Sequence, residues 1–226
     1  MSLPTTFFGW IEKLLQEYGP LFLTGAGYTM LIAISGTVLG FLLGLLVAVV
    51  RTIPVTRKDH FVKRALMKVA NLILNIYIEV FRGTPMIVQA MVIYYGSMMY
   101  LDINMSTLFA AIFIISINTG AYMAEIIRGG IISVDKGQKE GAHAIGMTHW
   151  QSMVHVVLPQ AVRNIMPSIG NEFVVNIKDS SVLNVIAVSE LFFVGKTAAG
   201  TYLVYFEVFA IIAAIYFVLT FTTTRL

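Results

Sequence analysis

The sequence predicts an all-α integral membrane protein with several transmembrane helices, and three observations support this prediction. Hydrophobic residues make up 58% of the 226 residues, whereas soluble domains average about 45–50%. Charged residues make up 12% of the chain, about half of their usual share. Several charge-free runs reach the length of about 20 residues that a helix needs to cross a bilayer. These features exclude a disordered chain and argue against an ordinary soluble domain.

Charge and cysteine content exclude further classes of protein. The net charge of +3 is typical of a membrane protein with basic inward-facing loops, so it does not indicate nucleic-acid binding. The chain has no cysteine, which excludes disulfides, thiolate metal sites and iron–sulfur clusters.

Residues 1–19 predict a short amphipathic helix at the membrane surface. Its apolar stripe at helical spacing consists of Phe7, Ile11, Leu14 and Tyr18. A charge-free run over residues 18–50 predicts the first span. Three glycines at intervals of four residues, a pattern typical of close helix packing, lie within this span at Gly36, Gly40 and Gly44.

The remaining spans follow from apolar runs at 83–101, 103–124 and 208–224, with a break predicted at residues 83–85 because of Pro85. The stretch 160–206 is apolar but ambiguous. It carries the charged residues Arg163, Glu172, Lys178, Asp179, Glu190 and Lys196. If it contributes one span, the chain crosses the membrane five times. The basic segments at 51–68 and 128–163 are then cytoplasmic, the N-terminus lies outside and the C-terminus inside.

Three predicted helices carry polar stripes, although charged or amide groups are costly inside a membrane. Glu172, Asn176 and Asp179 share one helix face, and Asn171 and Lys178 adjoin it. Asn118, Tyr122 and Glu125 repeat the spacing on another helix, and Gln89 lies one turn after Pro85. Such stripes predict either a polar cavity or inter-helix hydrogen bonds. We favour the cavity for Glu172, Asn176 and Asp179, and a structural ion pair for Glu125 and Arg128.

The segment 135–160 is too polar for the membrane, and helices broken at Gly141 and Gly146 are expected there. Its histidines, His143, His149 and His155, lie on different helix faces and do not suggest a metal site. Glu140, Gly141 and Ala142 are followed at fixed intervals by Gly146, Val156, Leu158 and Pro159. This pattern resembles the EAA loop of the permeases of ABC importers, with Gly141 in place of alanine and Val156 in place of isoleucine.

Further segments resemble the polar amino-acid uptake branch of that family, at residues 82–85, 88–89, 121–130, 137–138, 158–163, 171–173 and 178–181. Ser180 departs from the threonine that is more frequent there. The resemblance covers about residues 20–220. It implies a single five-span domain of the type I importer class in the bacterial plasma membrane, with 135–160 as the cytoplasmic EAA loop.

The resemblance also implies partners. A second permease, identical or a sibling, would complete the pathway, and an extracytoplasmic binding protein would deliver an amino acid. A separate ATPase dimer would bind ATP and Mg²⁺, because this chain has no phosphate-binding loop motif and is not expected to be an enzyme. No cofactor or metal is expected in this chain. Glu140, Gly141, Ala142 and Gly146 would form the coupling helix and its turn, with Glu140 capping the helix or pairing locally.

The polar stripes are the candidate substrate contacts. Glu172 would face the amino group or a cationic side chain of the substrate. The carboxylate of the substrate would be bound by Asn176, Gln89 and the unwound backbone near Thr84 and Pro85. Asn171, which adjoins the stripe, is a further candidate substrate contact. Lys178 and Asp179 would contact the substrate or form an ion pair at the helix end, and both interpretations stay open.

Two other functions fit the composition. A self-contained secondary carrier or channel would leave the EAA spacing without a purpose and would usually show internal repeats. An intramembrane enzyme would need catalytic groups inside a span, whereas the histidines lie in basic cytoplasmic segments. The sequence leaves open which amino acid is moved, whether the dimer is symmetric, and whether the native chain continues beyond Leu226.

Overall fold

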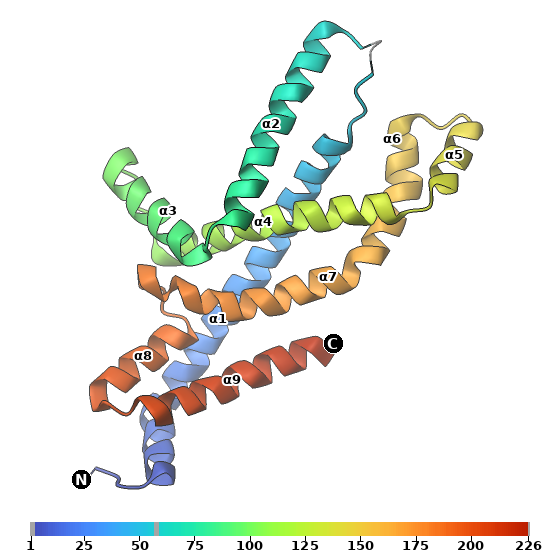
Figure 1. Ribbon diagram of the computed structural model, residues 1–226. Coiled ribbons are helices and arrows are strands. Elements are labelled where there is room, and N and C mark those ends of the chain that lie inside the picture. Colours follow the sequence, from blue (N-terminus) through green and yellow to red (C-terminus); the bar gives the residue numbers. More distant parts are fainter. Residues whose placement is uncertain (1–2, 57–58, 226) are drawn as a thin grey trace. The chain divides into compact units, whose positions relative to one another are not determined.

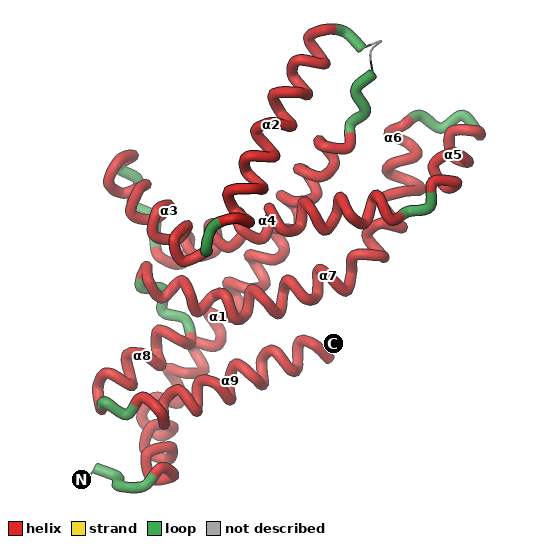
Figure 2. The backbone as a smooth tube through the Cα atoms, viewed as in Figure 1, coloured by secondary structure: helices red, strands yellow, loops and turns green. Residues whose placement is uncertain are grey.

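The computed structural model describes residues 3–56 and 59–225, and every regular element within these ranges is helical (Figure 2). The helices in chain order are α1 (Phe7–Thr52), α2 (Phe61–Gly83), α3 (Met86–Leu101), α4 (Thr107–Ser133), α5 (Lys136–Ala144), α6 (His149–Ser152), α7 (Leu158–Asp179), α8 (Leu191–Tyr202) and α9 (Tyr205–Arg225), as labelled in Figure 1. A π-helical turn, Met153–Val157, precedes α7, and a 3₁₀ segment, Ser180–Ile186, follows it.

The predicted surface helix and the first span form one helix, α1, of 46 residues. The expected separation near residue 19 is therefore wrong, although the helix itself is present. Pro20 lies inside α1 and is tolerated because Leu14 and Phe22, on either side of it, are both buried in the same core. Tertiary packing thus outweighs the backbone hydrogen bond that proline removes. The location of residues 7–19 at the membrane surface stays a prediction.

The predicted break near Pro85 is confirmed. α2 ends at Gly83, Thr84 is extended with φ −123° and ψ 147°, and α3 begins at Met86. The Thr84 hydroxyl donates to the Val80 carbonyl oxygen at 2.7 Å, which satisfies one acceptor at the end of α2.

α4 begins after a turn in which Asp102 has φ +54°. It continues to Ser133, beyond the end at residue 124 that the charge-free run suggested. Glu125 and Arg128 remain within the helix because they pair with each other at 2.7 Å.

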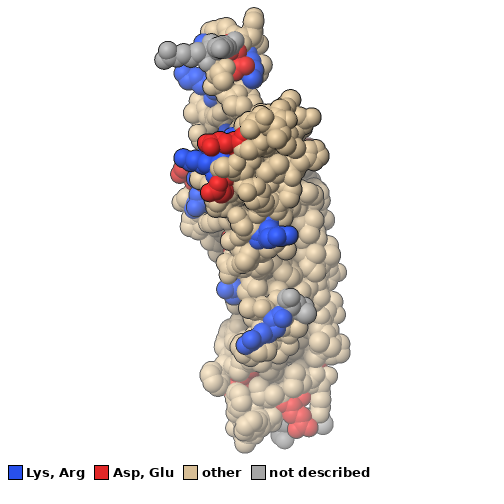
Figure 3. Space-filling view, turned by 90° about the vertical axis from the view of Figure 1, so that its right-hand side faces the viewer, with Lys and Arg blue, Asp and Glu red and all other residues tan. Residues whose placement is uncertain are grey.

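Three helices, α1, α4 and α9, are long and apolar enough to cross a membrane in the part of the chain that the structure describes. The number rises to five if α2 and α3 together count as one broken span and α7 and α8 together count as another. Figure 3 shows few charged side chains on a largely uncharged surface, as expected for a lipid-facing protein.

The described chain forms two compact units, and α1, α4 and α7 each contribute to both. The first unit contains residues up to Gly36, Met86–Ile115 and the chain from Phe173 onward. In its core, Phe22 of α1 packs with Leu191 of α8 and residues of α9, and Ile32 packs with residues of α3, α4 and the 3₁₀ segment.

The second unit contains Thr37–Pro85 and Ser116–Glu172. Here α1 and α4 approach closely through glycine, as predicted. A Cβ atom on Gly40 would lie 2.7 Å from Cβ of Thr119, and one on Gly44 would lie 2.8 Å from the backbone nitrogen of Ala124. Only glycine permits this approach of the two backbones.

Candidate functional site

The residues of the predicted polar stripe, Glu172, Asn176 and Asp179, all lie within α7, which ends at Asp179. The 3₁₀ segment follows directly. The prediction that Glu172, Asn176 and Asp179 share one helix face is therefore confirmed. Asn176 is buried, whereas Glu172 and Asp179 are half-buried. The stripe therefore combines a buried amide with carboxylates that remain partly accessible.

The eight candidate substrate residues are divided between the two units. The first unit contains Gln89, Asn176, Lys178 and Asp179, and the second contains Thr84, Pro85, Asn171 and Glu172. Gln89 is buried in the first turns of α3, whereas Thr84, Pro85 and Asn171 are exposed. The unwound backbone expected at Thr84 and Pro85 is present.

The exposed side chain of Lys178 lies between two hollows of the first unit. One has a volume of about 410 Å³ and is bounded by Val174, Lys178, Phe217, Thr220, Phe221, Thr224 and Arg225. The other, the Lys178 pocket, has a volume of about 370 Å³. It is lined by Lys178, Ser181, Phe192, Phe209, Ile212, Ala213 and Tyr216.

The chemistry of the Lys178 pocket suits a small zwitterion or anion. Its walls are mostly aromatic and aliphatic, and the Phe192 and Phe209 rings are 5.3 Å apart between centroids. The Lys178 ammonium supplies a cation, and the side chains of Ser181 and Tyr216 complete the lining. An apolar lining with a few polar groups is the usual composition of a small-molecule site.

The alternative of an ion pair between Lys178 and Asp179 is not found. The ion pairs of the described residues join Arg51 to Glu125, Asp59 to Lys63 and Arg128 to Glu125.

Glu190 is fully buried, and the sequence interpretation did not select it. It caps the N-terminus of α8, where its carboxylate accepts from the backbone N–H groups of Phe192 at 2.9 Å and Phe193 at 2.8 Å. It also accepts from the hydroxyls of Tyr216 at 2.8 Å and Thr29 at 3.5 Å. An acidic residue directly before an apolar run is a helix-start signal that could have indicated the cap.

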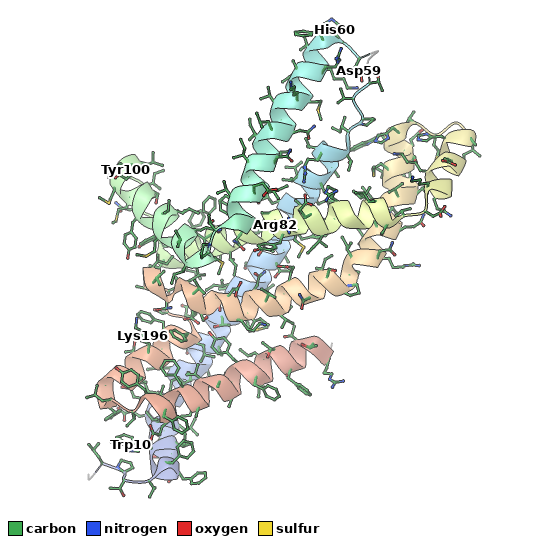
Figure 4. The ribbon with its side chains drawn as sticks, in the orientation of Figure 1. Trp10, Asp59, His60, Arg82, Tyr100 and Lys196 are labelled. Atoms are coloured by element: carbon green, nitrogen blue, oxygen red, sulfur yellow. The ribbon has the colours of Figure 1, made fainter. Side chains whose placement is uncertain are left out.

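The polar stripe of α4 makes contacts within the second unit. Asn118 Nδ2 donates to the Phe81 carbonyl oxygen at 3.2 Å, and the Arg82 guanidinium lies 5.5 Å from the centroid of the Tyr122 ring. Figure 4 labels Arg82 at the end of α2. These contacts support the interpretation of this stripe as inter-helix bonding.

The predicted ion pair of Glu125 with Arg128 is confirmed and has a third member. Arg128 Nη2 lies 2.7 Å from Glu125 Oε2, and Arg51 at the end of α1 pairs with Glu125 Oε1. Arg51 and Glu125 are 74 residues apart, so no local pattern could have indicated this partner. The three side chains connect α1 to α4.

The expected coupling helix is α5, which begins at an Asp135 cap that accepts from the Gly137 N–H at 2.7 Å. Glu140 is exposed, and its side chain has no hydrogen bond or ion pair among the described residues. The expectation that Glu140 caps or pairs locally is therefore wrong. The break expected at Gly141 is also wrong, because Gly141 lies inside α5, whose Ala142 is buried.

The turn expected at Gly146 is confirmed, with φ +87°, a conformation that favours glycine. Thr148 and Gln151 then form a reciprocal capping box that starts α6. On either side of the turn, Ile145 is 77% exposed and Trp150 is 57% exposed. Large apolar side chains are therefore exposed on both sides of the turn.

The chain is similar to known transport proteins over most of its length. The model of the family described as "Binding-protein-dependent transport system inner membrane component" matches residues 40–226. The glutamine transport system permease protein GlnP of Escherichia coli K12 is 35% identical over 202 residues, which are 89% of this chain and 87% of that protein. The arginine transport system permease protein ArtQ of Bacillus subtilis is 33% identical, over 91% of this chain and 88% of that protein.

A solved structure shares the fold. It is described as an amino acid ABC transporter with histidines, is 37% identical, and superimposes with a TM-score of 0.83 over 98% of this chain and 95% of that one.

Proposed function

We propose that this chain, which belongs to the family of binding-protein-dependent transport system inner membrane components, is the membrane-spanning subunit of an ATP-driven amino-acid importer. The amino-acid permeases among its relatives support this proposal. It would cross the bacterial plasma membrane five times and form a dimer, identical or with a sibling subunit. The dimer would admit substrate by alternating access.

The observation that supports this function most directly is the structure of the EAA loop, residues 135–160, which we call the coupling loop. Glu140, Gly141 and Ala142 of the EAA spacing lie on a capped helix, α5, which is followed by a left-handed turn at Gly146. Ile145 and Trp150, on either side of this turn, are exposed. A carrier that works alone has no use for such a surface. We infer that a separate ATPase subunit binds it, and that an extracytoplasmic binding protein supplies the substrate.

The Lys178 pocket is the proposed site for the substrate carboxylate. A lysine ammonium beside aromatic walls attracts an anionic group more strongly than one in water, because the surroundings are less polar. Asn176 and Gln89, which belong to the same unit as the pocket, are proposed amide contacts. Glu172, which belongs to the second unit, is a separate proposal as the partner of an amino group.

The test is ATP hydrolysis by this chain co-expressed with its ATPase in liposomes, with binding protein loaded with single amino acids. Loaded binding protein should stimulate hydrolysis, and the amino acid that stimulates it identifies the substrate. If no ATPase associates and the chain alone moves an amino acid down its gradient, the function is that of a carrier and the proposal is wrong.

The turn provides a matched pair of variants. Gly146→Ala forces a side chain into a left-handed conformation and should uncouple hydrolysis from the loaded binding protein. Gly141→Ala adds the same atoms inside α5, where no other atom lies within 4 Å, and should leave coupling intact. Equal coupling in the two variants would contradict a rigid turn at the ATPase surface.

Glu172→Gln tests the proposed amino-group contact. Uptake should fall while assembly with the ATPase is unchanged, because the amide keeps the size of the side chain and loses its charge. Glu12→Gln, at an exposed position of α1, is the control. Normal uptake by the Glu172 variant would show that Glu172 does not contact the substrate.

A further inference from the structure

Glu190 has acceptor capacity beyond what a helix cap requires. Serine, threonine and asparagine cap helices as well as a carboxylate does, and they avoid the cost of burying a charge. A carboxylate has about four acceptor positions, and here two receive backbone N–H groups of α8. The others reach the side chains of Tyr216 and Thr29. The buried charge therefore holds side chains of other helices.

The groups that Glu190 holds are walls of the Lys178 pocket. The side chain of Tyr216, whose hydroxyl donates to Glu190 Oε2 at 2.8 Å, lines the pocket from α9. Phe192, whose N–H donates to the same oxygen at 2.9 Å, lines it from α8. One carboxylate oxygen thus contacts both α8 and α9, two helices that bound the pocket.

Thr29 extends this arrangement to α1. Its hydroxyl oxygen accepts from the Leu191 N–H at 3.3 Å and lies 3.5 Å from Glu190 Oε2. A Cβ atom on Gly25 would lie 3.0 Å from Cα of Leu191, so α1 and the start of α8 are in tight contact. All of these residues belong to the first unit. The α8 wall of the pocket therefore packs closely against α1.

We propose that Glu190 is a positioning residue for the Lys178 pocket, acting through Tyr216 and Phe192 to set the width of the site that receives the substrate carboxylate. This inference rests on the function proposed for the chain. Glu190 itself does not line the pocket, so it acts on the substrate only through the residues that it holds.

Two variants separate positioning from capping. Glu190→Asp keeps a good helix cap but is one methylene shorter, so it should lose the Tyr216 hydroxyl. Tyr216→Phe removes the same hydrogen bond from the other side and keeps the ring. Tyr202→Phe is the matched control, because the Tyr202 hydroxyl donates to Glu17 at 2.7 and 2.8 Å on an exposed part of the same unit.

The readout uses the absence of cysteine from the chain. Ala213→Cys places one thiol in the pocket lining within the full complex in nanodiscs. Its labelling rate is measured with an anionic and a neutral methanethiosulfonate. Glu190→Asp and Tyr216→Phe should each change the ratio of the anionic to the neutral labelling rate by about three-fold or more. The double variant should show no larger change than either single variant, because the effects of residues in one network are not additive. Tyr202→Phe should keep the ratio of the parent.

Different outcomes test the positioning role of Glu190 and the substrate site at Lys178. If Glu190→Asp and Tyr216→Phe label at the parent ratio with unchanged melting temperatures, Glu190 is only a helix cap and the inference is wrong. Protection of the thiol by the transported amino acid, and a lower anionic rate in Lys178→Gln, test the pocket itself. If neither occurs, the substrate site proposed at Lys178 is wrong, whatever the Glu190 variants show.

Discussion

At the residue scale, the carboxylates of Glu125 and Glu190 are stabilised in different ways. Glu125 is paired with two arginines, whereas the hydrogen-bond donors to Glu190 among the described residues are uncharged N–H and O–H groups. Buried carboxylates need such partners, because their loss of hydration is costly. The first arrangement connects α1 to α4, and the second connects α8 to α1 and α9.

Glu125→Gln should destabilise the second unit by about 1–3 kcal/mol, because two arginines then lie together without their common counter-ion. The Glu125 and Arg51 side chains are each 19% exposed, so solvent only partly compensates. The free energy of unfolding can be measured by detergent-induced unfolding followed by circular dichroism.

The Asp59–Lys63 pair, in which the lysine side chain is 47% exposed, is the control for this prediction. Hydrogen bonds from the Lys63 ammonium and the Thr56 backbone N–H lower the pKa of the Asp59 carboxyl to about 2, so Asp59 is ionised at neutral pH. Asp59→Asn should nevertheless change stability little, since exposed ion pairs contribute little. If the two variants are equally stable, the Glu125 cluster is not a significant stabilising contact.

At the element scale, glycine positions decide how close helices approach. The glycines of α1 at positions 40 and 44 face backbone and side-chain atoms of α4. By contrast, Gly27 on the same helix has no atom within 4 Å of an added Cβ. The same residue type therefore has different roles along one helix.

Gly44→Ala should destabilise the protein by about 1–3 kcal/mol, because an added methyl group overpacks the contact with α4. Gly27→Ala should be neutral or slightly stabilising, because alanine is the better helix former. Melting temperatures of the two variants in detergent provide the comparison. A Gly44→Ala melting temperature equal to that of Gly27→Ala would show that α1 and α4 can separate at no cost.

At the scale of the whole molecule, the proposed functional sites are distributed over two units. The coupling loop and the ion cluster of Glu125 belong to the second, and the Lys178 pocket and Glu190 belong to the first. α1, α4 and α7 contribute residues to both units.

The proposed orientation can be tested directly in intact cells. Single cysteines at Thr5 and Asn104, both exposed, should react with a membrane-impermeant maleimide, because the positive-inside rule places them outside. A cysteine at Thr148 in the coupling loop should react only after permeabilisation. Labelling of Thr148→Cys in sealed cells would reverse the proposed topology.

The sequence determined the local features of this protein. Helical periodicity indicated the shared face of Glu172, Asn176 and Asp179, Pro85 predicted the break after α2, and Gly146 predicted the turn of the coupling loop. Each depends on dihedral preferences or spacing within a few residues, which the local sequence largely sets. Gly141 was misjudged because glycine inside an exposed helix costs only about 1 kcal/mol, which the Asp135 cap helps to offset.

Only the tertiary structure decided the rest. The partnership of Arg51 with Glu125, and the contacts of Glu190 with Thr29 and Tyr216, join residues 26 to 161 positions apart. The continuity of α1 through Pro20 likewise depends on packing against α8 and α9. The physical reason is that burial and hydrogen bonding are satisfied by whichever groups the fold brings within reach, and neither spacing nor composition specifies those groups.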